Sequence, residues 1–348
     1  MATTGRDRRS LTLPWAWYVS PEVLRREQEL IFRGAWHYAG PLEWAAQPGE
    51  HFPSWAGAAP VMVVRDRDGT LRAFLNVCRH RGSVIVKERG RRETLQCPYH
   101  AWTYGLDGSL RTAPRSERET DFDACELSLR PLLVDAWGPF VFVNTDLGAG
   151  PLAGSLGRLP ELIDTDALVF RERVGLDVGA NWKVAVENYL ECYHCPVAHK
   201  AFSTLVDVDP DAYRLEVSDG LLSQFGERRQ GVPGGGADSC QFHLVWPALK
   251  VIVYPGETNL SIGPLWPDGV ERSAGFLDYF FGPDVPDEAQ RELLAFDDRV
   301  GVEDRELVES VQRGLRSGLI ERGRLLLDSE SLVAAFQERV AATLGQTS

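Results

Sequence analysis

Two short stretches of the sequence, NVCRHRG at residues 76–82 and QCPYHAW at residues 96–102, decide how this chain folds. They contain four side chains able to bind a metal: Cys78, His80, Cys97 and His100. Each stretch follows residues typical of a β-strand, so we expect the four side chains on two facing loops. Two thiolates and two imidazoles are suitable ligands for zinc or for an iron–sulfur cluster.

The pairing of these four residues distinguishes the two kinds of site. Tetrahedral zinc sites with two cysteines and two histidines usually hold the cysteines on one segment and the histidines on the other. Here each loop supplies one cysteine and one histidine. This arrangement resembles a Rieske [2Fe–2S] domain, in which both cysteines bind one iron and both histidines bind the other. The resemblance implies that the free nitrogens of His80 and His100 face solvent or a redox partner, and a zinc site is the alternative.

A second group of possible ligands lies in the stretch ENYLECYHCPVAH at residues 187–199. We expect a helix over about residues 182–193, because apolar and polar residues alternate there with a helical period. On such a helix Glu187, Glu191 and His194 share one face.

Two histidines of this stretch are expected to meet at one metal. His194 and His199 are about 140° apart around a regular helix, so a continuing helix would separate their rings. Pro196 lies between them and can end the helix, which allows both imidazoles to converge. Two histidines and one carboxylate form the set of ligands that holds non-haem iron(II) with open positions.

The carboxylate of this set is expected from a long helical pattern over about residues 286–316. The apolar stripe of this pattern consists of Val300, Leu307, Val308, Val311 and Leu315. Asp304 falls within the stripe, and a carboxylate on a buried face needs a partner such as a metal. Glu303 is the reserve candidate, whereas Asp297 and Asp298 are less well placed.

The composition is that of a globular protein, which we expect in the cytoplasm. Its formal net charge of −13 argues against a nucleic-acid partner, and no apolar run is long enough to span a membrane. Arg8 and Arg9 resemble an export signal, but Pro14 interrupts the apolar run, so we expect a flexible cytoplasmic leader. Cys192 and Cys195 lack the βαβ context of a thiol redox motif, and we interpret both as packing residues.

The rest of the pattern predicts strands first and helices later. A helix is expected over about residues 21–32, with Ser20 as its N-cap. Strands are expected at residues 61–64, 71–77, 102–104, 140–143, 242–246, 251–254, 260–262 and 276–281. Glycines at residues 148–157 indicate a linker, and a last helix is expected over about residues 329–344. This order predicts an α+β fold of about two domains.

With both groups of ligands present, the chain resembles the terminal oxygenase (α) component of the Rieske non-haem iron oxygenases. The resemblance rests on the two loops, the histidine pair and the stretch at residues 181–188. It implies an N-terminal helix in residues 1–33 that packs on the catalytic domain, an all-β Rieske domain in residues 34–150 and a catalytic mononuclear iron domain in residues 151–348. The catalytic domain would have a helix-grip-like fold, an antiparallel sheet flanked by helices.

The same resemblance implies cofactors and partners. The four loop residues would hold a [2Fe–2S] cluster. A mononuclear Fe(II) would be bound by His194, His199 and Asp304. Glu191 would carry electrons from His100 of a neighbouring subunit, which implies a homotrimer, and Asn188 would be a further catalytic residue. A separate NAD(P)H-dependent reductase, alone or with a ferredoxin, would supply electrons for hydroxylation or oxidative demethylation of a small organic substrate by O2.

The substrate class is indicated by one position. Glu191 stands where many family members have aspartate, which is similar to the branch acting on carnitine, choline and betaines. Aromatic residues that could surround an ammonium group or a ring, or simply pack in the core, are Phe225, Phe242, Trp246, Tyr254, Trp266 and Tyr279. An aromatic or carboxylic acid substrate is the alternative. An electron carrier without oxygenase activity and a zinc-stabilised binding module are alternatives of other classes.

Overall fold

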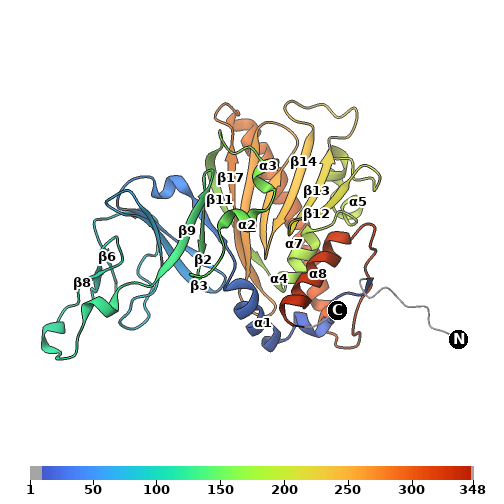
Figure 1. The fold of residues 1–348 in the computed structure, drawn as a ribbon. Helices are drawn as coiled ribbons and strands as arrows, with labels where there is room; N and C mark the ends of the chain where they lie inside the picture. The colour runs from blue at the N-terminus through green and yellow to red at the C-terminus, as the bar shows by residue number, and fades with distance from the viewer. Residues whose placement is uncertain (1–9, 346–348) are drawn as a thin grey trace. The chain divides into compact units, whose positions relative to one another are not determined.

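The computed structural model describes residues 10–345 and divides them into two units (Figure 1). The first unit contains residues 32–152, and the second contains residues 10–31 together with residues 153–345. The leader that we expected around Arg8 and Arg9 lies outside the described residues. In the described part of the chain, no helix is both long and apolar enough to cross a membrane.

The first unit is built from antiparallel strands. Its larger sheet has the order β1-β10-β9-β4-β3-β2-β5, formed by His37–Pro41, Phe140–Asn144, Pro131–Trp137, Leu71–Leu75, Ala59–Arg65, Glu50–Ala56 and Gly90–Arg91. A small sheet, β6-β7-β8, is formed by Leu95–Gln96, Thr103–Tyr104 and Leu110–Thr112. The all-β character expected for this part of the chain is confirmed.

Strand β3 contains a continuous apolar run, residues 61–64, because both of its faces are buried. Val61 and Val63 pack in one buried cluster, whereas Met62 and Val64 pack in another. Successive side chains of a strand point to opposite faces, so β3 is buried on both sides. The cluster around Met62 and Val64 also contains Cys78 and Cys97, which fixes the two loops to this core.

The second unit contains one antiparallel sheet with helices, which confirms the expected α+β class. The sheet has the order β11-β17-β16-β15-β14-β13-β12, formed by Val169–Val178, Ser273–Phe281, Asn259–Pro267, Leu249–Val253, Ser239–Val245, Leu221–Glu227 and Arg214–Ser218. The main helices are α1 (Pro21–Glu27), α4 (Trp182–Tyr189), α5 (Cys195–Ala198), α6 (Lys200–Leu205), α7 (Asp287–Leu315) and α8 (Ser331–Thr343). Helix α4 lies against α7 and β16, and α8 lies against β12 and β13 (Figure 1).

The N-terminal segment packs against α4 through a buried polar network. The carboxylate of Glu27 is fully buried and accepts hydrogen bonds from Lys183 Nζ at 2.6 Å and Trp182 Nε1 at 2.9 Å. The hydroxyl of Tyr18 donates to the carboxylate of Glu187 at 2.6 Å. A buried ion pair is tolerated only when its remaining hydrogen bonds are satisfied, and Trp182 supplies one of them.

The structure corrects our prediction for helix α4, which ends at Tyr189 and not near residue 193. Beyond it, the carboxylate of Glu191 accepts hydrogen bonds from the backbone N–H groups of Tyr193 and His194. These bonds replace the carbonyl partners of a continuing helix, because a side-chain acceptor competes with the backbone. Glu187 therefore turns toward the N-terminal segment and does not share a face with Glu191 and His194.

Several further elements differ from expectation, among them the segment after the first unit and strand β11. The segment interpreted as a linker contains α2 (Leu152–Leu156) and is followed by α3 (Leu159–Leu162). Strand β11 was not expected, since its side chains are mostly exposed or half-buried and carry no continuous apolar signal. The helix expected over residues 21–32 is present as α1 followed by a π-helical turn at Gln28–Phe32, and the Ser20 side chain caps it.

Candidate metal centres

The two loops of the first unit have the same backbone closure. The N–H of Gly82 donates to the carbonyl of Cys78 at 3.0 Å, and the N–H of Ala101 donates to the carbonyl of Cys97 at 3.1 Å. Both donors have a left-handed backbone, with φ of +76° at Gly82 and +57° at Ala101. The two loops therefore present their cysteine and histidine side chains in equivalent ways.

Sulfur atoms and imidazoles are placed differently in these loops. Both cysteines are buried, whereas His80 and His100 are exposed, with ring centroids 4.7 Å apart. The ring of His80 stacks on Trp102 with centroids 4.9 Å apart, which fixes its orientation. Exposed imidazole edges match the sequence-based expectation that these nitrogens face solvent or a partner.

The surroundings of the two cysteines shift their pKa values in opposite directions. Burial alone would raise the pKa of Cys97, but the backbone N–H groups of Tyr99 and His100 lower it. Burial raises the pKa of Cys78, whose sulfur lies 3.3 Å from the hydroxyl of Tyr104. Two buried sulfurs beside two exposed imidazoles fit the donor set of a Rieske [2Fe–2S] cluster.

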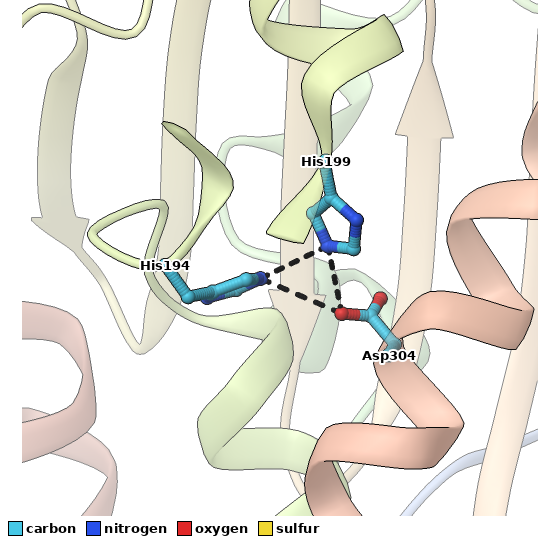
Figure 2. A group of neighbouring side chains, drawn as sticks. All are labelled: His194, His199 and Asp304. Carbon is cyan, nitrogen blue, oxygen red and sulfur yellow. Dashed lines mark hydrogen bonds and ion pairs between the residues drawn. The ribbon is translucent and has the colours of Figure 1, made fainter. Parts of the chain in front are cut away.

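In the second unit, two imidazoles and one carboxylate converge from different segments (Figure 2). The Nε2 atoms of His194 and His199 are 3.1 Å apart. Oδ1 of Asp304 lies 2.9 Å from Nε2 of His199 and 3.4 Å from Nε2 of His194. His194 and His199 flank the short helix α5, and Asp304 comes from α7. Three donor atoms around one point fit a two-histidine, one-carboxylate iron site.

Each of these ligands has a further hydrogen-bond partner. Nδ1 of His194 hydrogen bonds with the carboxylate of Glu191. Nδ1 of His199 lies 2.7 Å from Oε2 of Glu303, so the reserve candidate contacts the nitrogen that faces away from Asp304. Nδ2 of Asn188 donates to Oδ1 of Asp304 at 2.6 Å. The carboxylates on Nδ1 fix the orientation of the two imidazoles and raise their basicity as metal ligands.

Hydrogen bonding outweighs burial in the electrostatics of this group. Burial alone would raise the pKa of Asp304, but hydrogen bonds with His194 and His199 hold it well below its usual range. Burial would lower the pKa of His194, yet Asp304 and Glu191 raise it to about 9. In the metal-free protein the carboxylates thus attract positive charge to this point, which a divalent cation can provide.

A cavity of about 410 Å³ adjoins the three ligands. Three of the six aromatic residues identified in the sequence line it, namely Phe242, Tyr254 and Tyr279, and the other three do not. Further aromatic walls come from Tyr189, Phe202 and Tyr213. The volume suits a small organic molecule in contact with the candidate metal.

Both halves of the chain match models of known families. Residues 41–130 match the Rieske [2Fe-2S] domain, and residues 165–346 match the ring hydroxylating alpha subunit (catalytic domain). The chain belongs to the Rieske ring-hydroxylating oxygenases. This oxygenase is therefore an oxidoreductase of a family whose Rieske domain carries a [2Fe–2S] cluster and whose catalytic domain binds a mononuclear non-haem iron.

Individual relatives cover nearly the whole oxygenase. It is 33% identical to the carnitine monooxygenase oxygenase subunit of Acinetobacter pittii, over 95% of this chain and 94% of the relative. It is 33% identical to the chloroplastic choline monooxygenase of Spinacia oleracea, over 96% of this chain and 78% of the relative. The crystal structure of the quaternary ammonium Rieske monooxygenase CntA with L-carnitine superposes with a TM-score of 0.86 at 30% identity, covering 99% of both chains.

Our interpretation of two cysteines of the oxygenase needs correction. Cys192 and Cys195 are not merely packing residues, because a disulfide joins them within a buried cluster. Their Cα atoms are 4.9 Å apart, within the range of a disulfide. The disulfide closes a short loop that contains His194 and directly follows Glu191.

The sequence reasoning also underestimated Asp297 of the oxygenase. This carboxylate is buried in the cavity wall and accepts hydrogen bonds from the hydroxyls of Tyr254 and Tyr279. Burial raises its pKa, an effect that the two hydroxyls and the charge of Lys250 oppose. Asp297 lies seven residues before Asp304 in α7, and this helical spacing is the signal that could have indicated it.

Proposed function

We propose that this chain is the terminal oxygenase component that hydroxylates or oxidatively demethylates a small quaternary ammonium compound. Electrons come from a separate NAD(P)H-dependent reductase, directly or through a ferredoxin. The observation that supports this most strongly is the convergence of His194, His199 and Asp304 beside an aromatic cavity. Bound iron supplies O2 activation there, and the bound [2Fe–2S] cluster supplies single electrons.

The proposed ligand roles follow the donor sets. Cys78, His80, Cys97 and His100 would hold the cluster. His194, His199 and Asp304 would hold the iron, and the hydrogen bond from Asn188 would keep the Asp304 carboxylate in place. We assign these roles to a Rieske domain at residues 34–150 and a catalytic domain at residues 151–348, preceded by an N-terminal helical segment at residues 1–33.

We propose that Glu191 is the electron bridge between subunits of a homotrimer. Its carboxylate already contacts Nδ1 of His194, so a partner on its other side would be joined to the iron ligand. Exposed apolar residues beside it, Tyr193 and Val197, suit a protein interface, as does exposed Tyr99 beside His100. Light scattering coupled to size exclusion tests the trimer, and a monomer would contradict this role.

The substrate proposal rests on the cavity wall and the relatives. A quaternary ammonium group is attracted to the faces of aromatic rings and cannot donate a conventional hydrogen bond. The cavity offers several such rings together with the carboxylate of Asp297. Two of the relatives described above are a carnitine monooxygenase and a choline monooxygenase. We place the enzyme in the cytoplasm, where NAD(P)H is available to its reductase.

The decisive experiment measures coupled oxygen uptake with a surrogate reductase. Betaines and other quaternary ammonium compounds are expected to stimulate uptake, whereas uptake with aromatic acids alone would contradict the substrate class. Glu191→Ala should keep the red-brown cluster colour and lose at least about 100-fold in turnover, since an electron bridge acts in every cycle. Glu306→Ala, an exposed position of α7, is the control. Colourless, zinc-containing protein would contradict the whole proposal.

An electron carrier without oxygenase activity makes a different prediction. In that case His194→Ala and Asp304→Ala would leave every measurable activity intact. We expect both variants to retain the cluster spectrum and to lose substrate-dependent oxygen uptake, because two ligands cannot hold iron as three do.

A further inference from the structure

One cation of the cavity wall, Lys250, is half-buried and forms no ion pair with the described residues. Lys250 lies on β15, the central strand of the sheet, and its side chain lines the cavity. Among residues 10–345, its ammonium has no hydrogen bond or ion pair, and it lies over the ring of Tyr189, 4.8 Å from Nζ to the centroid. That ring is fixed, because its hydroxyl donates to the carbonyls of His243 and Val251.

The neighbouring carboxylates do not neutralise Lys250. Asp297 is occupied by two tyrosine hydroxyls, and Oδ1 of Asp304 is occupied by Asn188 and the two imidazoles. Both carboxylates attract Lys250 at longer range, but neither forms an ion pair with it. Its partners across the sheet, Leu244 and Gly263, bring no charge.

An ammonium in such a place indicates an anionic ligand. Burying an unpaired charge is unfavourable, and a strand position between apolar neighbours would be filled at lower cost by an apolar residue. Burial lowers the pKa of Lys250, and an anion bound beside it would oppose that effect. A ligand in the cavity could supply the ion pair that the described residues do not form with Lys250.

We propose that Lys250 binds a carboxylate of the substrate, so that this oxygenase acts on zwitterions carrying both a quaternary ammonium and a carboxylate group. This inference rests on the proposed function and specifies its substrate class. In this arrangement the substrate carboxylate pairs with Lys250, and its ammonium group lies against aromatic rings of the cavity. A quaternary ammonium alcohol offers Lys250 only a neutral hydroxyl and leaves its charge unpaired.

The test compares binding of two ligands that differ at the anionic end. Isothermal titration of the iron-loaded oxygenase, without reductant, uses γ-butyrobetaine as the carboxylated probe and choline as the uncharged-end probe. The wild-type protein should bind γ-butyrobetaine at least about 10-fold more tightly than choline. Lys250→Met should weaken γ-butyrobetaine about 10- to 100-fold and change choline less than about 3-fold, and Lys250→Arg should restore most of the preference.

Lys87→Met, an exposed position of the first unit, controls for the loss of a positive charge. Cluster absorbance and iron content show whether Lys250→Met has folded, and the Lys250→Arg variant tests the site if it has not. Equal binding of both probes to the wild type, or equal weakening of both in Lys250→Met, overturns the inference and leaves the proposed function standing. Failure of both probes to bind the wild type contradicts the proposed substrate class itself.

Discussion

At His199, one ring nitrogen faces the candidate iron position and the other faces Glu303. His194 is held in the same manner by Glu191, whereas Asn188 donates to the oxygen of Asp304 that also faces the two histidines. Sequence reasoning could name the three inner residues, because histidine and carboxylate types at suitable spacing carry the chemistry. It could not assign Glu303 to its actual contact, since neighbouring positions of one helix differ by only about 100° in direction.

Asn188 offers a prediction at this scale. Asn188→Leu keeps the volume but removes the only amide donor to Oδ1 of Asp304 that the described residues provide. We expect iron(II) affinity to fall about 10- to 100-fold, because the carboxylate loses its fixed orientation. Iron titration of the iron-depleted protein measures this, with Glu306→Gln as the control. Unchanged affinity would show that the hydrogen bond does not position the ligand.

At the scale of one element, the start of helix α4 could be predicted from the sequence but its end could not. The pattern correctly predicted where the helix begins, since Asn181 caps it and its side chain accepts from the N–H of Lys183. The end was wrong because it depends on the carboxylate of Glu191 folding back onto the next turn of backbone. Such local competition between side chain and backbone leaves no trace in the apolar period.

Glu187, near the end of α4, predicts a pH dependence of stability. Burial raises its pKa to about 7, against 4.5 for an unperturbed glutamate. A raised pKa in the folded state means that stability is complete below pH 4.5 and is lost as pH rises through about 7. Glu187→Gln, which can still accept a hydrogen bond from Tyr18, should remove this loss. At pH 8 its free energy of unfolding should be about 1–3 kcal/mol higher than that of the wild type.

Urea unfolding at pH 5 and pH 8 checks this expectation for Glu187→Gln and wild type. The exposed Glu338→Gln variant, on α8, controls for the loss of one charge. A difference between Glu187→Gln and wild type that stays the same at both pH values would mean that Glu187 does not titrate in this range.

At the scale of the whole molecule, each unit has its own sheet and its own buried clusters. The class of both units could be predicted, because strand runs and helical periods are local signals. The order of the strands could not, since pairing of β11 with β17 joins residues about 100 positions apart and is determined by burial of the entire sheet.

Separate cores predict separate responses to loss of a ligand. Cys97→Ser should abolish the visible absorption and the cluster iron, while the mononuclear iron of the second unit remains. Metal analysis and absorption spectra test this, with Cys125→Ser as the control, because Cys125 is free and exposed. Loss of all iron in Cys97→Ser would show that the two centres depend on each other for assembly.

Strand β3 separates the two buried clusters of the first unit and contributes side chains to both. Its odd-numbered valines belong to one interior, and Met62 and Val64 belong to the interior that contains the cluster cysteines. Looser packing of one cluster weakens the packing of the other, because both share β3. Loss of the iron–sulfur cluster should therefore speed amide hydrogen exchange even in the buried cluster that contains Val61 and Val63. The exchange rates of the seven-stranded sheet would then report whether the two loops hold their cluster.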